Sequence, residues 1–426
     1  MSDKQIFAAV EVADSEVRLI VGEFFNTRFN IIKVEKVPCS GMTFNEVTDP
    51  DAIITALHKA CADVKKMLGA EIRKVILAMP SYRLKRYSLQ SSVNVEGIDQ
   101  VVTIQDVRNA VHKAERAQIP GQYALLQAVC QKYTVNGVTT RKIPLGEHTD
   151  KLTVDIDLLC ADRKVSFDLV GAVEKAGLSV LDIFPDVFAI GKETALLQAS
   201  MDKQVIILKV GRTATTLGYL HQGRVASAAV LPAGLGTLAS GAVEKYGLKS
   251  EMAVELLKYS VRLGEDQASE NPIHIWSDGQ QTHTVNEREF VESIHENLEK
   301  WLDAIDKTCV PILQAGETTV IITDEGGETQ GLSDLVARRL GCECRCYIPE
   351  TLGGRNAGLT ACLGLFYAYQ DKLPITGYIE DSLDMDAFVK AVSYRENTPA
   401  LRKQETANKE DTLTNKLKGL FLEGKK

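Results

Sequence analysis

The chain has 426 residues, a length that predicts two or three domains at roughly 150 residues each. Its hydrophobic fraction of 45% and charged fraction of 25% are typical of a soluble globular protein. With 49 Lys and Arg against 57 Asp and Glu, the net charge is −8, which argues against a nucleic-acid-binding protein.

Membrane spans and disulfides are not expected either. The longest largely apolar stretch, residues 359–369, is about half of the ~20 residues that cross a bilayer. The first residues hold no basic region followed by an apolar one, so no secretory signal is predicted. Nine scattered cysteines favour reduced thiols in a cytoplasm. Cys342, Cys344 and Cys346 alternate along one face of a strand, which favours buried thiols over a zinc site.

Two segments of the chain share one pattern. Residues 6–34 and 205–231 each read as strand, small-residue loop, strand, hairpin turn and strand. When Glu11 is aligned with Lys209, the second copy follows the first after about half the chain. A duplicated three-strand meander, each copy followed by helices, predicts two related α/β lobes.

The remaining elements follow from periodicity and capping residues. Helices are expected at 52–68, 107–117, 164–176, 250–262, 287–313 and 358–370. Further strands are expected at 75–80, 125–135, 152–160 and 320–323. The helix that ends at Leu313 should bury Phe290, Ile294, Leu298, Trp301 and Leu302. Residues 371–411 are rich in charge and poor in large apolar side chains, which predicts a linker with a short helix near 385–394.

The small-residue loops indicate a phosphate site. Backbone N–H groups and hydroxyls of two facing loops can hold phosphoryl oxygens, and a glycine turn at 323–327 can lie under a base. No constellation of His, Ser or Cys suggests hydrolytic catalysis, and the seven histidines lack metal-ligand spacing. No catalytic residue and no metal ligand is therefore predicted.

The order of these motifs resembles the FtsA family of bacterial cell-division proteins, within the actin, Hsp70 and sugar-kinase superfamily. The matching segments are residues 9–23, 208–216, 230–236, 251–258, 320–332 and 352–369. The resemblance implies an α/β, actin-like two-lobe (ribonuclease H-like) fold with an FtsA-type inserted subdomain and a C-terminal amphipathic helix. It places the first lobe at 1–83 and 164–199, interrupted by the inserted subdomain at 84–163. The second lobe core is expected at 200–238 and 316–357, a helical subdomain at 239–315, the closing helix at 358–370, the linker at 371–411 and the terminal helix at 412–426.

The resemblance also implies a nucleotide site. Its cofactor-binding residues would be Glu11, Ser15, Gly211, Arg212, Thr213, Glu255, Lys258, Gly326 and Gly327. This sequence departs from the family's first loop, because Ala13 replaces a glycine and Glu16 puts an anion where a cation would face phosphate. In the second loop Lys209, Arg212, Thr213 and Thr216 replace both acids and two glycines, which would place Lys209 and Arg212 near phosphates. In the turn at 323–327, Asp324 and Glu325 stand where the family has glycines. Loss of glycines and carboxylates predicts a weak or inactive ATPase. Binding of ATP with Mg2+ stays open.

The end of the chain predicts membrane contact. Leu413, Leu417, Leu420 and Phe421 fall on one face of a helix, flanked by Lys416 and Lys418. Residues 412–426 hold four lysines and one glutamate, which suits the interface of an anionic bilayer. A terminal helix docked on the protein's own core is the alternative that this pattern leaves open.

Together the resemblance and the tail imply a protein that tethers FtsZ filaments to the cytoplasmic face of the cell membrane. The expected partners are the C-terminal peptide of FtsZ, membrane lipids and further copies of this chain in an oligomer or filament. The alternatives are an active actin-like ATPase and a PilM-like pilus-assembly protein.

Overall fold

The computed structural model describes residues 4–396 apart from 27, 98, 265–268, 280 and 378–379. The predicted terminal helix at 412–426, with its proposed lipid-binding residues, lies outside the described residues. The same holds for the part of the predicted linker that follows residue 396.

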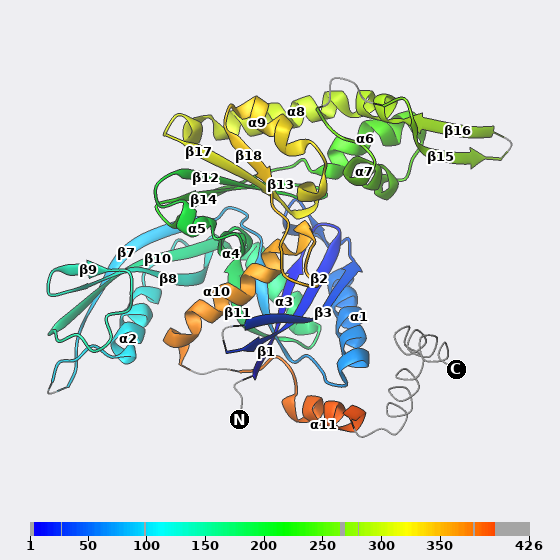
Figure 1. The fold of residues 1–426 in the computed structure, drawn as a ribbon. Coiled ribbons are helices and arrows are strands. Elements are labelled where there is room, and N and C mark those ends of the chain that lie inside the picture. Colours follow the sequence, from blue (N-terminus) through cyan, green and yellow to red (C-terminus); the bar gives the residue numbers. More distant parts are fainter. Residues whose placement is uncertain are drawn as a thin grey trace, which may run out of the picture.

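Two five-stranded sheets with the same topology form the core of the molecule (Figure 1). In each sheet, three antiparallel strands are followed by two parallel ones. The first sheet has the order β11 (Ser179–Pro185), β6 (Lys74–Met79), β1 (Lys4–Val12), β2 (Glu16–Phe25) and β3 (Arg28–Pro38). The second has the order β18 (Glu343–Cys346), β17 (Thr318–Thr323), β12 (Gln204–Val210), β13 (Thr215–His221) and β14 (Arg224–Leu231). The predicted duplication and the two α/β lobes are confirmed.

The repeat extends to the hydrogen bonds of the first loop in each sheet. Val12 pairs with Val17 across the first loop, and Val210 pairs with Thr215 across the second. In both loops the first backbone N–H donates to the fourth carbonyl, from Ala13 to Glu16 and from Gly211 to Ala214, at 2.9 Å in each case. Glu11 and Lys209 therefore occupy equivalent positions.

Helices cover both faces of each sheet. Side chains of α4 (Asp186–Glu193) and α10 (Thr360–Thr376) form one core with residues from both sheets, so these helices lie between the lobes. Gly364 allows α10 to cross α4 closely, because a Cβ there would lie 1.9 Å from the Ala189 carbonyl oxygen. The outer face of the first sheet packs on α1 (Pro50–Leu68) and α3 (Arg163–Lys175). That of the second packs on α6 (Leu235–Tyr246), α7 (Ser250–Tyr259), α8 (Glu287–Leu313) and α9 (Leu332–Leu340).

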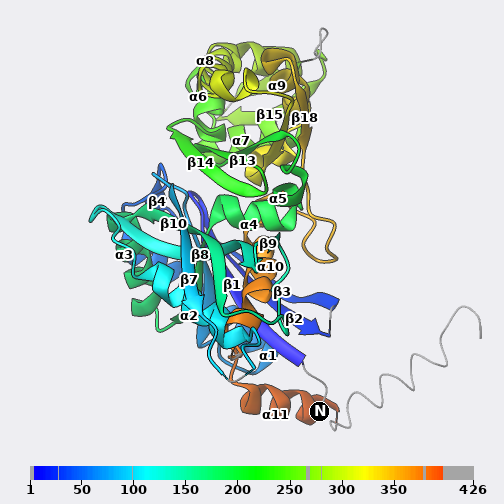
Figure 2. The ribbon, with the colours of Figure 1, turned by 90° about the vertical axis from the view of Figure 1, so that its left-hand side faces the viewer.

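A separate subdomain is inserted between β6 and α3, at the left of Figure 1 and in front in Figure 2. Its elements are β7 (Lys85–Asn94), α2 (Ile104–Glu115), β8 (Tyr123–Val135), β9 (Val138–Thr140) and β10 (Lys151–Asp162). The strands form their own sheet in the order β7, β10, β8, β9, and α2 covers it over a core of its own. A capping box between Thr103 and Asp106 starts α2.

The subdomain of the second lobe is only partly helical, which corrects the prediction for 239–315. A hairpin of β15 (Pro272–Asp278) and β16 (Gln281–Asn286) projects from it (Figure 1). Alternating His, Ile, Trp and Thr residues favour this strand pairing. The hairpin ends at Asn286, which begins α8 through a capping box with Glu289. All five residues predicted to lie in the core from α8 are buried.

The predicted boundary between closing helix and linker at residue 371 is wrong. α10 continues to Thr376, and the segment after it returns to the first sheet. Asp381 accepts the N–H of Ile6, and the Ser382 hydroxyl accepts the N–H of Ala8, both at 2.8 Å. These donors are free because β6 pairs with β1 only at Ala9 and Val10. Leu383 is buried, and α11 (Met385–Glu396) follows it below the first lobe in Figure 2.

Cys342, Cys344 and Cys346 do alternate at β18, but they are half-buried rather than buried because β18 is the edge strand of its sheet. They pack against the core of the second lobe. No cluster of metal-ligating side chains occurs in the described part of the chain. None of its described helices is long and apolar enough to cross a membrane.

Candidate site between the lobes

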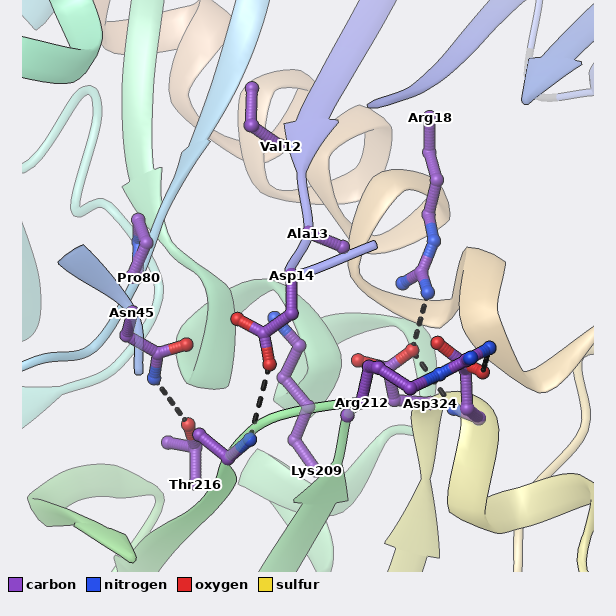
Figure 3. Close-up of a pocket in the computed structure, with 13 residues that line it drawn as sticks. Val12, Ala13, Asp14, Arg18, Asn45, Pro80, Lys209, Arg212, Thr216 and Asp324 are labelled. Atoms are coloured by element: carbon purple, nitrogen blue, oxygen red, sulfur yellow. Dashed lines mark hydrogen bonds and ion pairs between the residues drawn. The ribbon is translucent and has the colours of Figure 1, made fainter. Parts of the chain in front are cut away.

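The two repeated loops meet in the cleft between the lobes (Figure 3). The lining includes residues 13 and 14 of the first loop, residues 211, 212 and 214 of the second loop, and the first two residues of the 3₁₀ turn η1 (Asp324–Glu328). Asn45, between the short strands β4 (Met42–Thr43) and β5 (Glu46–Val47), closes one side. The remaining cavity measures about 10 Å³, close to the space that one water molecule needs.

Lys209 is the first centre of charge in the cleft. Its Nζ lies 2.7 Å from Glu11 Oε1 and 2.8 Å from Asp186 Oδ2, so it joins the second lobe to β1 and to the start of α4. Burial alone would lower the pKa of Lys209, but Asp186 and Glu11 raise it well above its usual range. The ammonium is therefore held charged by two carboxylates of the same chain.

Arg18 is the second centre of charge in the cleft. Its guanidinium lies 2.7 Å from Asp324, 2.8 Å from Glu16 and 3.1 Å from Glu11, and it donates to the Gly358 carbonyl at 2.6 Å. The side chain is only 1% exposed. Gly358 allows this approach, because a Cβ there would lie 3.2 Å from the Arg18 Cζ. Burial raises the pKa of Asp324 to about 6, against the lowering effect of Arg18 and Lys209.

Glu325 gathers donors from both lobes. Its carboxylate lies 3.0 Å from Arg212 and 3.7 Å from Lys258, and it accepts the Ser15 hydroxyl at 2.9 Å. Burial would raise the pKa of Glu325, but Arg212, Arg18 and Lys258 lower it below its usual value. These three cations therefore favour the ionised form of the Glu325 carboxylate.

Asp14 of the first loop binds the backbone of the second. Its Oδ2 accepts the N–H groups of Thr213 at 3.0 Å and Ala214 at 3.2 Å. Gly211 leaves room for the carboxylate, since a Cβ there would lie 3.1 Å from the same oxygen. Nearby, Asn45 donates its amide N–H to the Thr216 hydroxyl at 2.8 Å (Figure 3).

Six of the nine predicted cofactor residues lie in this cluster of charges and loops: Glu11, Ser15, Gly211, Arg212, Thr213 and Lys258. Of these six, only Gly211 and Arg212 line the cavity itself. The other three predicted residues lie outside the cluster. Glu255 is half exposed and touches the cluster only through Lys258. Gly326 and Gly327 are buried where a Cβ would meet Val210 and Ala357 respectively.

The predicted cofactor residues did not include Lys209, Asp324 or Glu325, which stood out only as departures from the family's loops. They also lacked four further residues of the site: Asp14, Arg18, Asn45 and Asp186. A usable signal existed for Arg18, which interrupts the apolar run of β2 at a position that must face inward. Asp186 carries a weaker signal in the sequence, since it directly follows the apolar end of β11, and the structure leaves it 1% exposed. Asp14 and Asn45 lie in loops, where a polar residue gives no indication of its partner.

The cations and anions of the site are paired with each other, although the buried Arg212 Nε has no hydrogen-bond partner among the described residues. This pairing and the cavity of about 10 Å³ leave no room for a nucleotide with Mg2+. Lys209 and Arg212, expected near phosphates, are bound by carboxylates of this chain. Glu16, expected to face a phosphate, instead lies 2.8 Å from Arg18 and 3.0 Å from Lys36. Glu11 and Asp186 share Lys209, and Asp14, the first-lobe acid that lines the cavity, accepts two backbone N–H groups of the second loop, so none of the three is free to ligate a divalent ion. In this arrangement the residues do not fit a nucleoside triphosphate.

Comparison with known families starts from the inserted subdomain. Residues 83–160 match the model of the SHS2 domain inserted in FtsA. The FtsA of Bacillus subtilis is 24% identical over 376 residues, which cover 86% of this chain and 83% of that protein. The FtsA of Enterococcus hirae is 22% identical, and the match covers 99% of both chains. The resemblance to FtsA is confirmed.

Solved structures similar to this FtsA-like chain share its fold at low identity. A PilM–PilN type IV pilus biogenesis complex has a TM-score of 0.57 at 15% identity, covering 84% of this chain and 97% of that one. The MamK double helical filament has a TM-score of 0.51 at 9% identity, and the match covers 86% of this chain and 98% of that one. MreB5 of Spiroplasma citri bound to AMPPNP has a TM-score of 0.50 at 10% identity, and the match covers 88% of this chain and 99% of that one. These likenesses confirm the predicted actin-like fold and carry no more than that.

Proposed function

We propose that this chain is an FtsA-like cell-division protein that tethers FtsZ filaments to the cytoplasmic face of the membrane. The observation that carries the proposal is an SHS2 domain of the FtsA type, inserted between β6 and α3 of an actin-like chain. Similarity to Enterococcus hirae FtsA along 99% of both chains supports the same assignment. A PilM-like role rests on fold similarity alone.

The tail supplies the proposed membrane contact. Leu413, Leu417, Leu420 and Phe421 would enter the acyl boundary of an anionic bilayer, with Lys416 and Lys418 among the headgroups. Each Lys adds about 1 kcal/mol near anionic lipid, and ordering the helix offsets part of the apolar gain. One copy would bind weakly and reversibly, whereas an oligomer or filament of this chain would bind more tightly through effective concentration.

The proposed site for the FtsZ C-terminal peptide is the subdomain of the second lobe, which contains α6, α7, β15, β16 and α8. On α7, Met252 and Tyr259 are seven residues apart and thus share a face, and they are 41% and 50% exposed. Large apolar side chains on an exposed helix face support a peptide contact there.

Binding and turnover of ATP with Mg2+ form the competing proposal, favoured by nucleotide-bound relatives of the fold such as MreB5 of Spiroplasma citri. Under it, Ser15, Gly211, Arg212 and Thr213 would hold phosphates. Each of the charged and polar contacts that now fill the cleft would first have to open.

Liposome flotation of the full chain tests the anchor. The double variant Leu417→Glu with Phe421→Glu places two charges on the apolar face and should abolish flotation on anionic vesicles. Asn415→Glu with Gly419→Glu adds the same charge on the opposite side of the helix, at 100° per residue, and should retain most of it. Equal flotation of the two variants would reject the membrane contact.

Co-sedimentation with FtsZ filaments in the absence of lipid tests the proposed contact between FtsZ and the subdomain of the second lobe. Met252→Glu should reduce binding, whereas Glu251→Gln, a neighbouring change on the same helix, should not. Unchanged binding of Met252→Glu would remove α7 from the proposed contact.

A further inference from the structure

We propose that the cleft is a self-bound site, in which carboxylates of this chain take the places that phosphates take in nucleotide-binding proteins of this fold. Asp14 and Glu325 are the internal anions, and Lys209 and Arg18 tie the lobes together around them. The closed arrangement would then need neither nucleotide nor Mg2+. This inference does not depend on FtsZ or on the membrane.

The contact of Asp14 resembles that of a bound anion. Two successive backbone N–H groups at a tight loop form a common binding place for phosphate oxygens. Here the N–H groups of Thr213 and Ala214 both donate to one oxygen of Asp14, which belongs to the opposite lobe. The first loop thus supplies the anion that the second loop is built to hold.

The repeat makes the charges complementary. Asp14 and Arg212 are equivalent positions of the two loops, as are Glu11 and Lys209. The first member of each pair is an acid and the second is a base. Glu11 and Lys209 meet directly at 2.7 Å, whereas Arg212 turns to Glu325 of its own lobe.

Further contacts cross the cleft on both sides of Asp14. They are Lys209 with Glu11 and with Asp186, Arg18 with Asp324, Ser15 with Glu325, and Asn45 with Thr216. Nearly all of these side chains are buried, and a buried charge that loses its partner is strongly destabilising. A nucleotide would have to displace several of these contacts together.

Hydrogen exchange of the nucleotide-free full chain, read by mass spectrometry on peptides that cover residues 211–216, tests the proposal. The wild-type amides of Thr213 and Ala214 should be protected before any nucleotide is added, and millimolar ATP with Mg2+ should not increase that protection. Fast exchange in the absence of nucleotide would overturn the proposal. Protection that appears only on addition of ATP and Mg2+ would also overturn it.

The variant Asp14→Ala removes the acceptor and should speed exchange of these two amides by about tenfold or more, as expected for loss of hydrogen bonds to a charged group. Asp168→Ala is the matched control, because Asp168 pairs with Lys164 on the surface at 2.8 Å. Unchanged exchange in Asp14→Ala, with the same rate as Asp168→Ala, would contradict the assignment of Asp14. Flotation and FtsZ binding are separate measurements, so failure here leaves the tethering proposal standing.

Discussion

The two repeated loops have the same backbone and opposite charge. Both close with the same 2.9 Å hydrogen bond between their first and fourth residues. The first carries Glu11 and Asp14 where the second carries Lys209 and Arg212. A repeated loop can therefore keep its backbone shape while its side chains carry opposite charges, provided that those side chains satisfy one another.

The loops also differ in how they use their small residues. Gly211 lets the Asp14 carboxylate reach the backbone of the second loop. Ala13, at the equivalent position of the first loop, is buried, and its backbone N–H bonds to Glu16 of its own loop rather than to an acid of the second lobe. An acid of the first loop, Asp14, therefore binds the backbone of the second loop, whereas among the described residues no acid of the second loop binds the backbone of the first.

The largest effect should come from Lys209→Met, which leaves the buried Asp186 without a cation and the buried Glu11 with Arg18 alone. Glu11 and Asp186 would lose their shared cation, and we expect a loss of about 3–5 kcal/mol in the free energy of unfolding. Urea denaturation measures it. Lys164→Met, which breaks an exposed pair, should cost less than about 1 kcal/mol. A loss as small in Lys209→Met as in this control would show that the lobes do not rely on the pair.

A smaller, pH-dependent effect is expected from Glu11→Gln. Burial would raise the pKa of Glu11, but Lys209 and Arg18 hold it below its ordinary value of 4.5. Its contribution is therefore complete above pH 4.5 and is lost as the pH falls through the lowered pKa. The variant should be about 2 kcal/mol less stable than wild type at neutral pH, and the difference should shrink in acid.

Thermal or urea unfolding between neutral and acid pH measures this difference. Glu23→Gln is the control, because Glu23 pairs with the exposed Lys4 and should change stability by less than about 1 kcal/mol. A constant difference between Glu11→Gln and wild type down to strongly acid pH would contradict the ionised state assigned to Glu11.

The smallest effect should distinguish the two equivalent loop positions. Gly211→Ala brings a Cβ to 3.1 Å from Asp14 Oδ2, and we expect a loss of about 1 kcal/mol together with faster exchange at residues 213 and 214. Ala13→Gly should cost ~0.5–1 kcal/mol through backbone entropy alone, with exchange at those amides unchanged. Similar exchange rates at residues 213 and 214 in the two variants would show that the two loop positions do not differ in this way.

Much of the fold was predictable, because it depends on local patterns. Alternating apolar strands indicated both meanders, and capping residues placed α1, α2 and α8 within a few residues. The β15–β16 hairpin was missed because its strands are mostly polar and exposed, and among its described residues only Ile273, Trp276 and Val285 pack on the core. The docking of Ser382 was missed because it depends on donors left free by a short β6.

The chemistry of the site was less predictable. Lys209 and Arg212 were noted as departures, but their partners could not be identified, since Asp186 and Glu325 lie far along the chain. Arg18 stands within a strand whose pattern gives its burial but not the three carboxylates around it. Such pairs are set by how the lobes meet, which no local pattern determines.

The central claim, that this cleft is held closed by its own charges, is tested most directly by calorimetric titration of the nucleotide-free full chain with ATP, with and without Mg2+. We predict no saturable heat of binding under either condition, and no change in the unfolding temperature at the same nucleotide concentration. Saturable binding of one nucleotide per chain, accompanied by a rise in that temperature, would contradict it.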